Sequence, residues 1–135
     1  MRILHFAFSG SVSNLYLPHN FEANTVAYTG THDNNTSQGW WVELDETTRH
    51  QVRDYLSLRS DDEAQIQWKL IEACCSSVAA TVIYPMQDVL GLGAESRMNL
   101  PGVGAGYWAW RFSWEQVHEW HATRLAKLGQ KFGRT

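Results

Sequence analysis

Residues 26–41 read VAYTGTHDNNTSQGWW, a short apolar and β-branched run that ends in a cluster of polar side chains. Such a run, bounded by turn-forming residues, is typical of a buried strand. In parallel α/β folds, ligands bind beyond the carboxyl ends of the strands. The segment therefore predicts a strand that carries a functional loop at its end, with His32 and Asp33 at its centre.

Two further segments have the same character as the strand at residues 25–29. Residues 3–8 and 79–84 are short, mostly apolar on both faces, and bounded by Gly, Pro, Asn or Ser. This pattern favours parallel strands that are covered by helices. We therefore predict an α/β fold with three parallel strands. So small an open sheet would have unpaired apolar edge strands, which indicates that the structure is incomplete.

Helical patterns occupy three stretches. The first covers about residues 46–58, and the second follows Ser60 and Glu63, which have the spacing of a capping box. The third is expected to start at Ser113, with Gln116 as its capping partner. Between strand and helix, the glycine-rich residues 91–106 are expected to form a loop on the same side as the His-Asp loop.

The composition indicates an ordinary globular domain. The chain has 135 residues, of which 44% are hydrophobic and 19% charged, with a net charge of -3. This size fits one hydrophobic core, and the charge gives no footprint for nucleic acid or for an anionic membrane. Cys74 and Cys75 are expected to be buried, reduced thiols, which favours a cytoplasmic location.

His32 and Asp33 are the sharpest chemical feature. An imidazole beside a carboxylate at a strand end is suited to acid or base chemistry, or to clamping a ligand by hydrogen bonds. The alternative is that Asp33 or Asn34 merely caps the following turn. A metal site needs at least three ligands, and the remaining histidines show no suitable spacing with His32, so we expect no metal site.

Tryptophan is abundant, with seven in the chain. An aromatic face can stack on a sugar ring, but Trp is also a large core residue. We expect Trp68, Trp114 and Trp120, which fall in helical patterns, to be core residues. A core role is less automatic for Trp108 and Trp110, which lie in a glycine-rich region.

A third group of polar residues follows the last strand: Asp88, Glu95, Arg97 and Asn99. The planar guanidinium of Arg97 is suited to a carboxylate and could orient Asp33 or Asp88. The alternative is a surface loop of solvated charges.

Several motifs together resemble the C-terminal part of the amylomaltases, the bacterial 4-alpha-glucanotransferases of glycoside hydrolase family 77. They are YLPHN at residues 16–20, YTGTHDNNT at 28–36, GWW at 39–41, QDVLGLGAESRMNLPG at 87–102 and WAWRF at 108–112. The resemblance implies that residues 1–135 form the C-terminal portion of a (β/α)8 barrel catalytic domain, from about its sixth to its eighth strand. It implies transfer of α-1,4-glucan segments between maltodextrins by a retaining mechanism without a cofactor.

The resemblance also implies residue roles. Asp33 is expected to be the catalytic carboxylate that stabilises the transition state, and His32 to bind sugar hydroxyls beside it. The other expected substrate-binding residues are Asn34, Asp88, Arg97, Asn99 and Trp108. Two positions depart from the family pattern: Asn35 stands where an acidic residue is frequent, and Tyr107 where Asn is common.

The resemblance further implies that two catalytic groups are absent. The family's Asp nucleophile and Glu acid/base lie on earlier strands, and no carboxylate here carries either motif. Because a retaining mechanism needs both, we expect the isolated chain to be inactive toward maltodextrins. The alternatives are a non-catalytic glucan-binding module and a non-functional truncated remnant.

Overall fold

The computed structural model describes residues 1–134, and its centre is a small parallel sheet. The sheet consists of β1 (Arg2–Ile3), β2 (Val26–Tyr28) and β3 (Thr81–Ile83), in the order β1-β2-β3. Both neighbouring pairs are parallel. The predicted α/β class with parallel strands is therefore confirmed.

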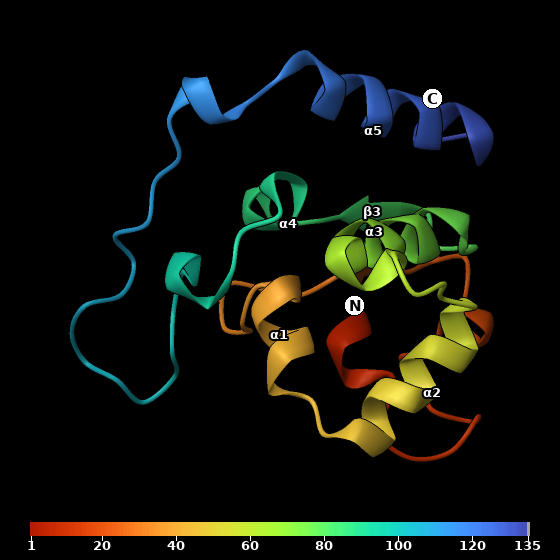
Figure 1. The fold of residues 1–135 in the computed structure, drawn as a ribbon. Helices are drawn as coiled ribbons and strands as arrows, with labels where there is room; N and C mark the ends of the chain where they lie inside the picture. Colours follow the sequence, from red (N-terminus) through yellow and green to blue (C-terminus); the bar gives the residue numbers. More distant parts are fainter. Residues whose placement is uncertain (135) are drawn as a thin grey trace.

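Helices connect the strands and follow the last of them (Figure 1). The α-helices are α1 (Ser37–Glu43), α2 (Glu46–Leu56), α3 (Ile66–Ser76), α4 (Met86–Leu90) and α5 (Glu119–Lys131). Five short 3-10 helices complete the elements: η1 (Leu4–Phe6), η2 (Pro18–Asn20), η3 (Asp62–Gln65), η4 (Ala94–Ser96) and η5 (Trp114–Gln116).

All three strands are shorter than the apolar runs that predicted them. The clearest case is residues 3–8, where β1 ends at Ile3 and η1 follows at once. Leu4 and Phe8 are buried in the helix-side core even though they lie outside the strand. Burial of these side chains accounts for the apolar run, so the run overestimated the strand.

The two faces of the sheet have different surroundings. Ala27 is fully buried in the core that α2 and α3 supply, and Val82 packs against the same core. Ile3, Tyr28 and Ile83 lie side by side in register and line an open pocket on the other face. Helices of the described chain therefore cover one face of the sheet, while the other is open.

The capping box predicted at Ser60 is wrong. Residues 62–65 form η3 without a side-chain cap, and α3 begins only at Ile66. The Glu63 carboxylate instead accepts a hydrogen bond from Arg53 Nε at 2.6 Å. That contact ties η3 to α2 and keeps Glu63 from reaching back to Ser60.

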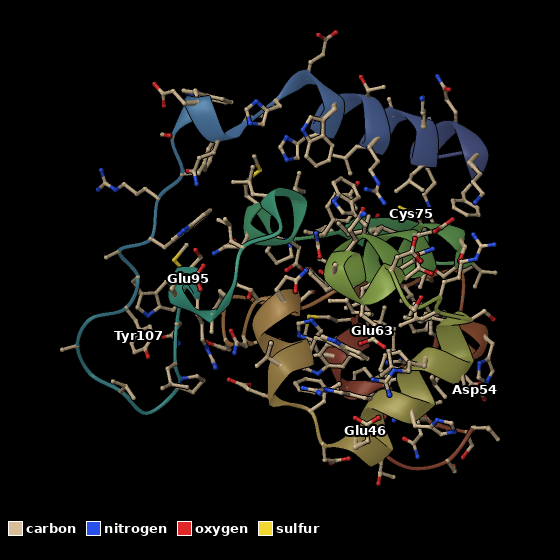
Figure 2. All side chains as sticks on the ribbon, viewed as in Figure 1. Glu46, Asp54, Glu63, Cys75, Glu95 and Tyr107 are labelled. Atoms are coloured by element: carbon tan, nitrogen blue, oxygen red, sulfur yellow. The ribbon has the colours of Figure 1, made fainter. Side chains whose placement is uncertain are left out.

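The C-terminal capping box does form, but around a different element. Ser113 and Gln116 enclose η5, and α5 starts later, at Glu119. Between α4 and α5, residues 91–118 run as a long arm that carries Glu95 and Tyr107 away from the sheet (Figures 1 and 2).

The tryptophan predictions hold only in part. Trp68 is 2% exposed and belongs to the core, whereas Trp114 is 77% exposed and Trp120 is 50% exposed. The two latter predictions are wrong. Leu125 and Leu128 of α5 pack against the cluster that contains Trp68, while the half-exposed ring of Trp120 lies 6.0 Å from the Trp68 ring at the edge of this contact.

Both cysteines are buried free thiols, as predicted. Cys74 lies in the core on the sheet side of α3, and Cys75 packs toward α5, where Figure 2 shows it between the two helices. Burial raises the pKa of both thiols.

Candidate functional site

An open pocket with a volume of about 810 Å³ lies at the carboxyl ends of the strands. Residues 30–36, which follow β2, form much of its wall, and residues after β3 and around Arg97 complete it. The apolar floor is made by Ile3, Tyr28 and Ile83. The position is the one expected for a ligand site in a parallel α/β fold.

The loop at residues 30–36 is a closed turn. Asn34 Oδ1 accepts hydrogen bonds from the Thr31 amide and the Thr31 hydroxyl, both at 2.8 Å, and the Asn34 amide donates to the Thr31 carbonyl. Asn34 therefore shapes the turn, as the capping alternative requires, and it also lines the pocket. The turn directs the neighbouring side chains, His32 and Asp33, outward.

Asp33 and His32 lie together at the rim of the pocket. Their side chains are 52% and 59% exposed, and His32 Nε2 is 3.5 Å from Asp33 Oδ2. The other carboxylate oxygen, Oδ1, accepts a hydrogen bond from Asn99 Nδ2 at 2.7 Å. One oxygen is thus held by an amide, while the carboxylate as a whole remains accessible to a ligand.

Arg97 supports this arrangement through the backbone. Its Nη2 donates to the main-chain carbonyl of Asp33 at 2.8 Å, and its Nε donates to the main-chain carbonyl of Asn99 at 2.6 Å. Both of these acceptors are main-chain carbonyls, so Arg97 does not make the expected contact with the carboxylate of Asp33 or Asp88. Arg97 instead ties the two segments that carry Asp33 and Asn99 to each other.

Trp108 places an aromatic face beside the imidazole. Its ring centroid is 5.1 Å from that of His32, with 45° between the planes, and the side chain is 61% exposed. The backbone has a φ of 64°, a conformation that costs energy for any residue but Gly, and its amide donates to the Met98 carbonyl at 2.7 Å. The arm therefore holds Trp108 in an unusual conformation next to the His-Asp pair.

Asp88 does not share this exposed site. It is 1% exposed, and its carboxylate accepts hydrogen bonds from the Thr29 hydroxyl, the Ser37 hydroxyl and the Ser37 amide. Burial raises the pKa of Asp88, and the three donors act in the opposite direction. Because the Asp88 carboxylate is buried and bound by three protein donors, it is not exposed to a substrate, contrary to the expected role. It instead supports the residues that carry the exposed site.

His5 is a polar residue of this region that no sequence pattern singles out. It is 7% exposed, its ring stacks on Trp40 with centroids 4.8 Å apart, and its Nε2 lies 2.9 Å from Ser37 Oγ. Burial lowers the pKa of His5 to about 3. A lone histidine in an apolar run resembles any core position, so only the fold identifies it.

Gly30 is required where His5 meets the loop. A Cβ at residue 30 would lie 2.6 Å from Cε1 of the His5 ring. The close approach lets the loop lie directly over the imidazole.

Residues 1–134 show neither a cluster of metal ligands nor a membrane-spanning helix. No group of three His, Cys, Asp or Glu side chains is arranged to hold a metal ion within this range. None of the helices described there is long and apolar enough to cross a membrane.

Comparison with known proteins gives a consistent family. The family model described as 4-alpha-glucanotransferase matches residues 1–117. The chain is 44% identical over 135 residues to a 4-alpha-glucanotransferase of Synechocystis sp., covering 99% of this chain and 26% of that protein. It is 51% identical over 111 residues to a chloroplastic/amyloplastic 4-alpha-glucanotransferase of Solanum tuberosum, covering 82% of this chain and 19% of that protein.

A solved structure agrees. An amylomaltase from Streptococcus agalactiae, solved in complex with acarbose, superposes with a TM-score of 0.93 at 32% identity. The match covers 99% of this chain and 27% of the amylomaltase, so the chain spans only about a fifth to a quarter of the length of these relatives. The match over residues 1–117 shows that this chain belongs to glycoside hydrolase family 77, the 4-alpha-glucanotransferases.

Proposed function

We propose that this chain provides one wall of a 4-alpha-glucanotransferase site, which transfers α-1,4-glucan segments between maltodextrins with retention of configuration. The observation that carries the proposal is the accessible Asp33 carboxylate at the pocket, which is held by Asn99 and lies beside His32, whose ring is next to that of Trp108. The structural relative in complex with acarbose supports a carbohydrate ligand of the glucan type.

In this proposal Asp33 stabilises the transition state. Glycosyl transfer passes through a state with oxocarbenium character, in which hydrogen bonds to ring hydroxyls strengthen. A carboxylate with one oxygen fixed by Asn99 accepts such hydroxyl hydrogen bonds in a defined direction. His32 Nε2 is placed to contact a neighbouring hydroxyl, and the exposed ring of Trp108 offers an apolar face for a sugar.

The open face of the sheet supports the barrel architecture that the family implies. Ile3, Tyr28 and Ile83 are aligned across three parallel strands and point away from the helices. In a (β/α)8 barrel, such inward side chains pack in layers against those of the other strands. We infer that residues 1–135 form the C-terminal portion of such a barrel domain.

The carboxylates explain why these residues alone should be inactive. Among the described residues that line the pocket, Asp33 is the one carboxylate. A retaining mechanism requires a nucleophile and an acid/base with carboxyl groups about 5–5.5 Å apart. We infer that both come from outside this stretch, and that the isolated chain does not turn over maltodextrins.

A chimera tests the proposal. The chain replaces the matching quarter of the Synechocystis enzyme, and the product is incubated with maltotriose while the release of glucose and longer dextrins is followed. We expect turnover by the chimera and none by the 135-residue chain. A folded chimera without activity would contradict the proposed function, and turnover by the isolated chain would contradict the account of the absent carboxylates.

Titration of the isolated chain with maltoheptaose addresses the alternative. Saturable binding by a monodisperse monomer, together with an inactive chimera, would favour a non-catalytic glucan-binding module. Three plant relatives carry names that include chloroplastic/amyloplastic, so the cytoplasmic location of this chain stays a prediction from its sequence.

A further inference from the structure

Asp88 joins the two ends of the loop that carries His32 and Asp33. Its Oδ2 accepts from Thr29 Oγ1 at 2.6 Å and from Ser37 Oγ at 2.7 Å, and its Oδ1 accepts from the Ser37 amide at 2.8 Å. Thr29 immediately precedes the loop at residues 30–36, and Ser37 immediately follows it. One buried carboxylate therefore fixes both points at which the loop leaves the body of the fold.

The same cluster connects the ends of all three strands. His5 follows β1, Thr29 follows β2, and Asp88 lies in α4, after β3. The His5 amide donates to the Thr29 carbonyl at 3.1 Å, and the His5 ring contacts Ser37 Oγ at 2.9 Å. All four side chains of the cluster are at most 7% exposed.

The hydrogen-bond pattern also assigns the protonation of His5. The Ser37 hydroxyl has one proton, which it donates to Asp88, so its oxygen accepts from His5 Nε2–H. Nδ1 is then the bare nitrogen, and it has no hydrogen-bond partner among the described residues. A buried Nδ1 without a proton leaves no unsatisfied N–H donor, which agrees with this assignment.

We propose that Asp88 is a positioning residue that clamps the loop at residues 30–36, and that it thereby sets the position of the Asp33 carboxylate. Asp33 itself is half exposed and is held by contacts from the arm, so its place depends on where the loop is anchored. The catalytic consequence rests on the proposed function, whereas the clamp is a property of the chain alone.

Hydrogen exchange of the chain tests the clamp through Thr29. Thr29→Val removes the hydroxyl but keeps the shape, and Thr29→Ser keeps the hydroxyl but removes a methyl group. We expect Thr29→Val to speed exchange of the Thr31 and Asn34 amides by about tenfold to a hundredfold relative to Thr29→Ser, the scale for losing a hydrogen bond to a buried charged acceptor. Exchange at Val52 in α2 should be the same in both variants.

Asp88→Asn gives an independent spectroscopic readout. An amide in place of Oδ2 donates to Ser37 Oγ, which frees the Ser37 proton for His5 Nε2 and shifts His5 toward the Nδ1–H tautomer in ¹⁵N spectra. The matched control Asp54→Asn changes an exposed carboxylate and should leave the tautomer unchanged. In the active chimera, Asp88→Asn should lower kcat by about 10²-fold with KM nearly constant, as expected for a misplaced catalytic group.

Two results would overturn the proposal, the first by refuting the clamp and the second by refuting its effect on Asp33. One is equal acceleration in Thr29→Val and Thr29→Ser, or uniform acceleration that includes α2, since either would indicate packing alone. The other is an active chimera whose kcat is unaffected by Asp88→Asn. An inactive parent chimera with the expected exchange pattern would leave the clamp supported and would contradict only the proposed function.

Discussion

Acidification should destabilise this chain through His5. The imidazole is buried between Trp40 and Ser37, and burial lowers its pKa to about 3. The nearest carboxylate in the cluster, Asp88, reaches the ring only through the Ser37 hydroxyl. Protonated His5 would therefore be a buried charge without a direct ion-pair partner, which is strongly disfavoured.

The sign and size of the effect follow from proton linkage. In the unfolded chain His5 takes up a proton as the pH falls through 6.5, whereas in the folded chain it stays neutral until about pH 3. Between these values the unfolded state binds more protons, so acid favours unfolding. From pH 7 to pH 5, the free energy of unfolding should fall by about 2 kcal/mol through this residue.

Urea unfolding at pH 7 and pH 5 measures the effect, with His5→Gln as the test variant. Gln keeps a donor near Nε2 but does not titrate, so the variant should lose about 2 kcal/mol less than the wild type on acidification. The raised pKa of Asp88 acts in the opposite direction, but Asp88 is present in both chains and cancels in the comparison. The control His50→Gln removes an exposed imidazole on α2 and should keep the full loss. Equal losses in wild type and His5→Gln would refute the reasoning.

Two further predictions concern packing and thiol reactivity. Gly30→Ala should lower the free energy of unfolding by about 1–3 kcal/mol, because its Cβ would collide with the His5 ring, while Gly104→Ala, in open space, should change it by less than about 0.5 kcal/mol in a urea titration. Equal effects would show that the ring yields freely. Burial and the raised pKa values of Cys74 and Cys75 should keep both thiols unreactive toward a disulfide reagent until urea unfolds the chain, and rapid native-state labelling would contradict this.

The sheet could be predicted from the sequence because short apolar runs bounded by turn-forming residues are typical of buried parallel strands. The sequence could not show where each strand ends, because Leu4 and Phe8 are buried in the core although they follow the end of β1. It also missed α1, which begins at Ser37 after the N-cap residue Thr36. The glycine and aromatic residues of that segment weaken a helical pattern, although Thr36 is a local N-cap whose hydroxyl accepts from the Gly39 amide three residues on.

At the site, the sequence indicated which polar residues follow strand ends, but it could not show which of them are buried and which are exposed. Asp33 and Asp88 are both carboxylates that follow strand ends, yet Asp33 is half exposed and Asp88 is 1% exposed. The difference arises because Asp88 lies in α4, where its carboxylate meets the donors of Thr29 and Ser37. Hydrogen bonds between residues more than fifty positions apart leave no local pattern to read.

The most direct test of the central claim is the kcat of the active chimera with Asp33→Asn, measured on maltotriose. Asn keeps the shape of the side chain and its contact with Asn99 can be retained, but the negative charge is lost. If Asp33 stabilises the transition state, kcat should fall by about 10²–10³-fold while KM changes little. An Asp33→Asn chimera with the parent kcat would contradict the assignment of Asp33 and, with it, the proposed role of this site.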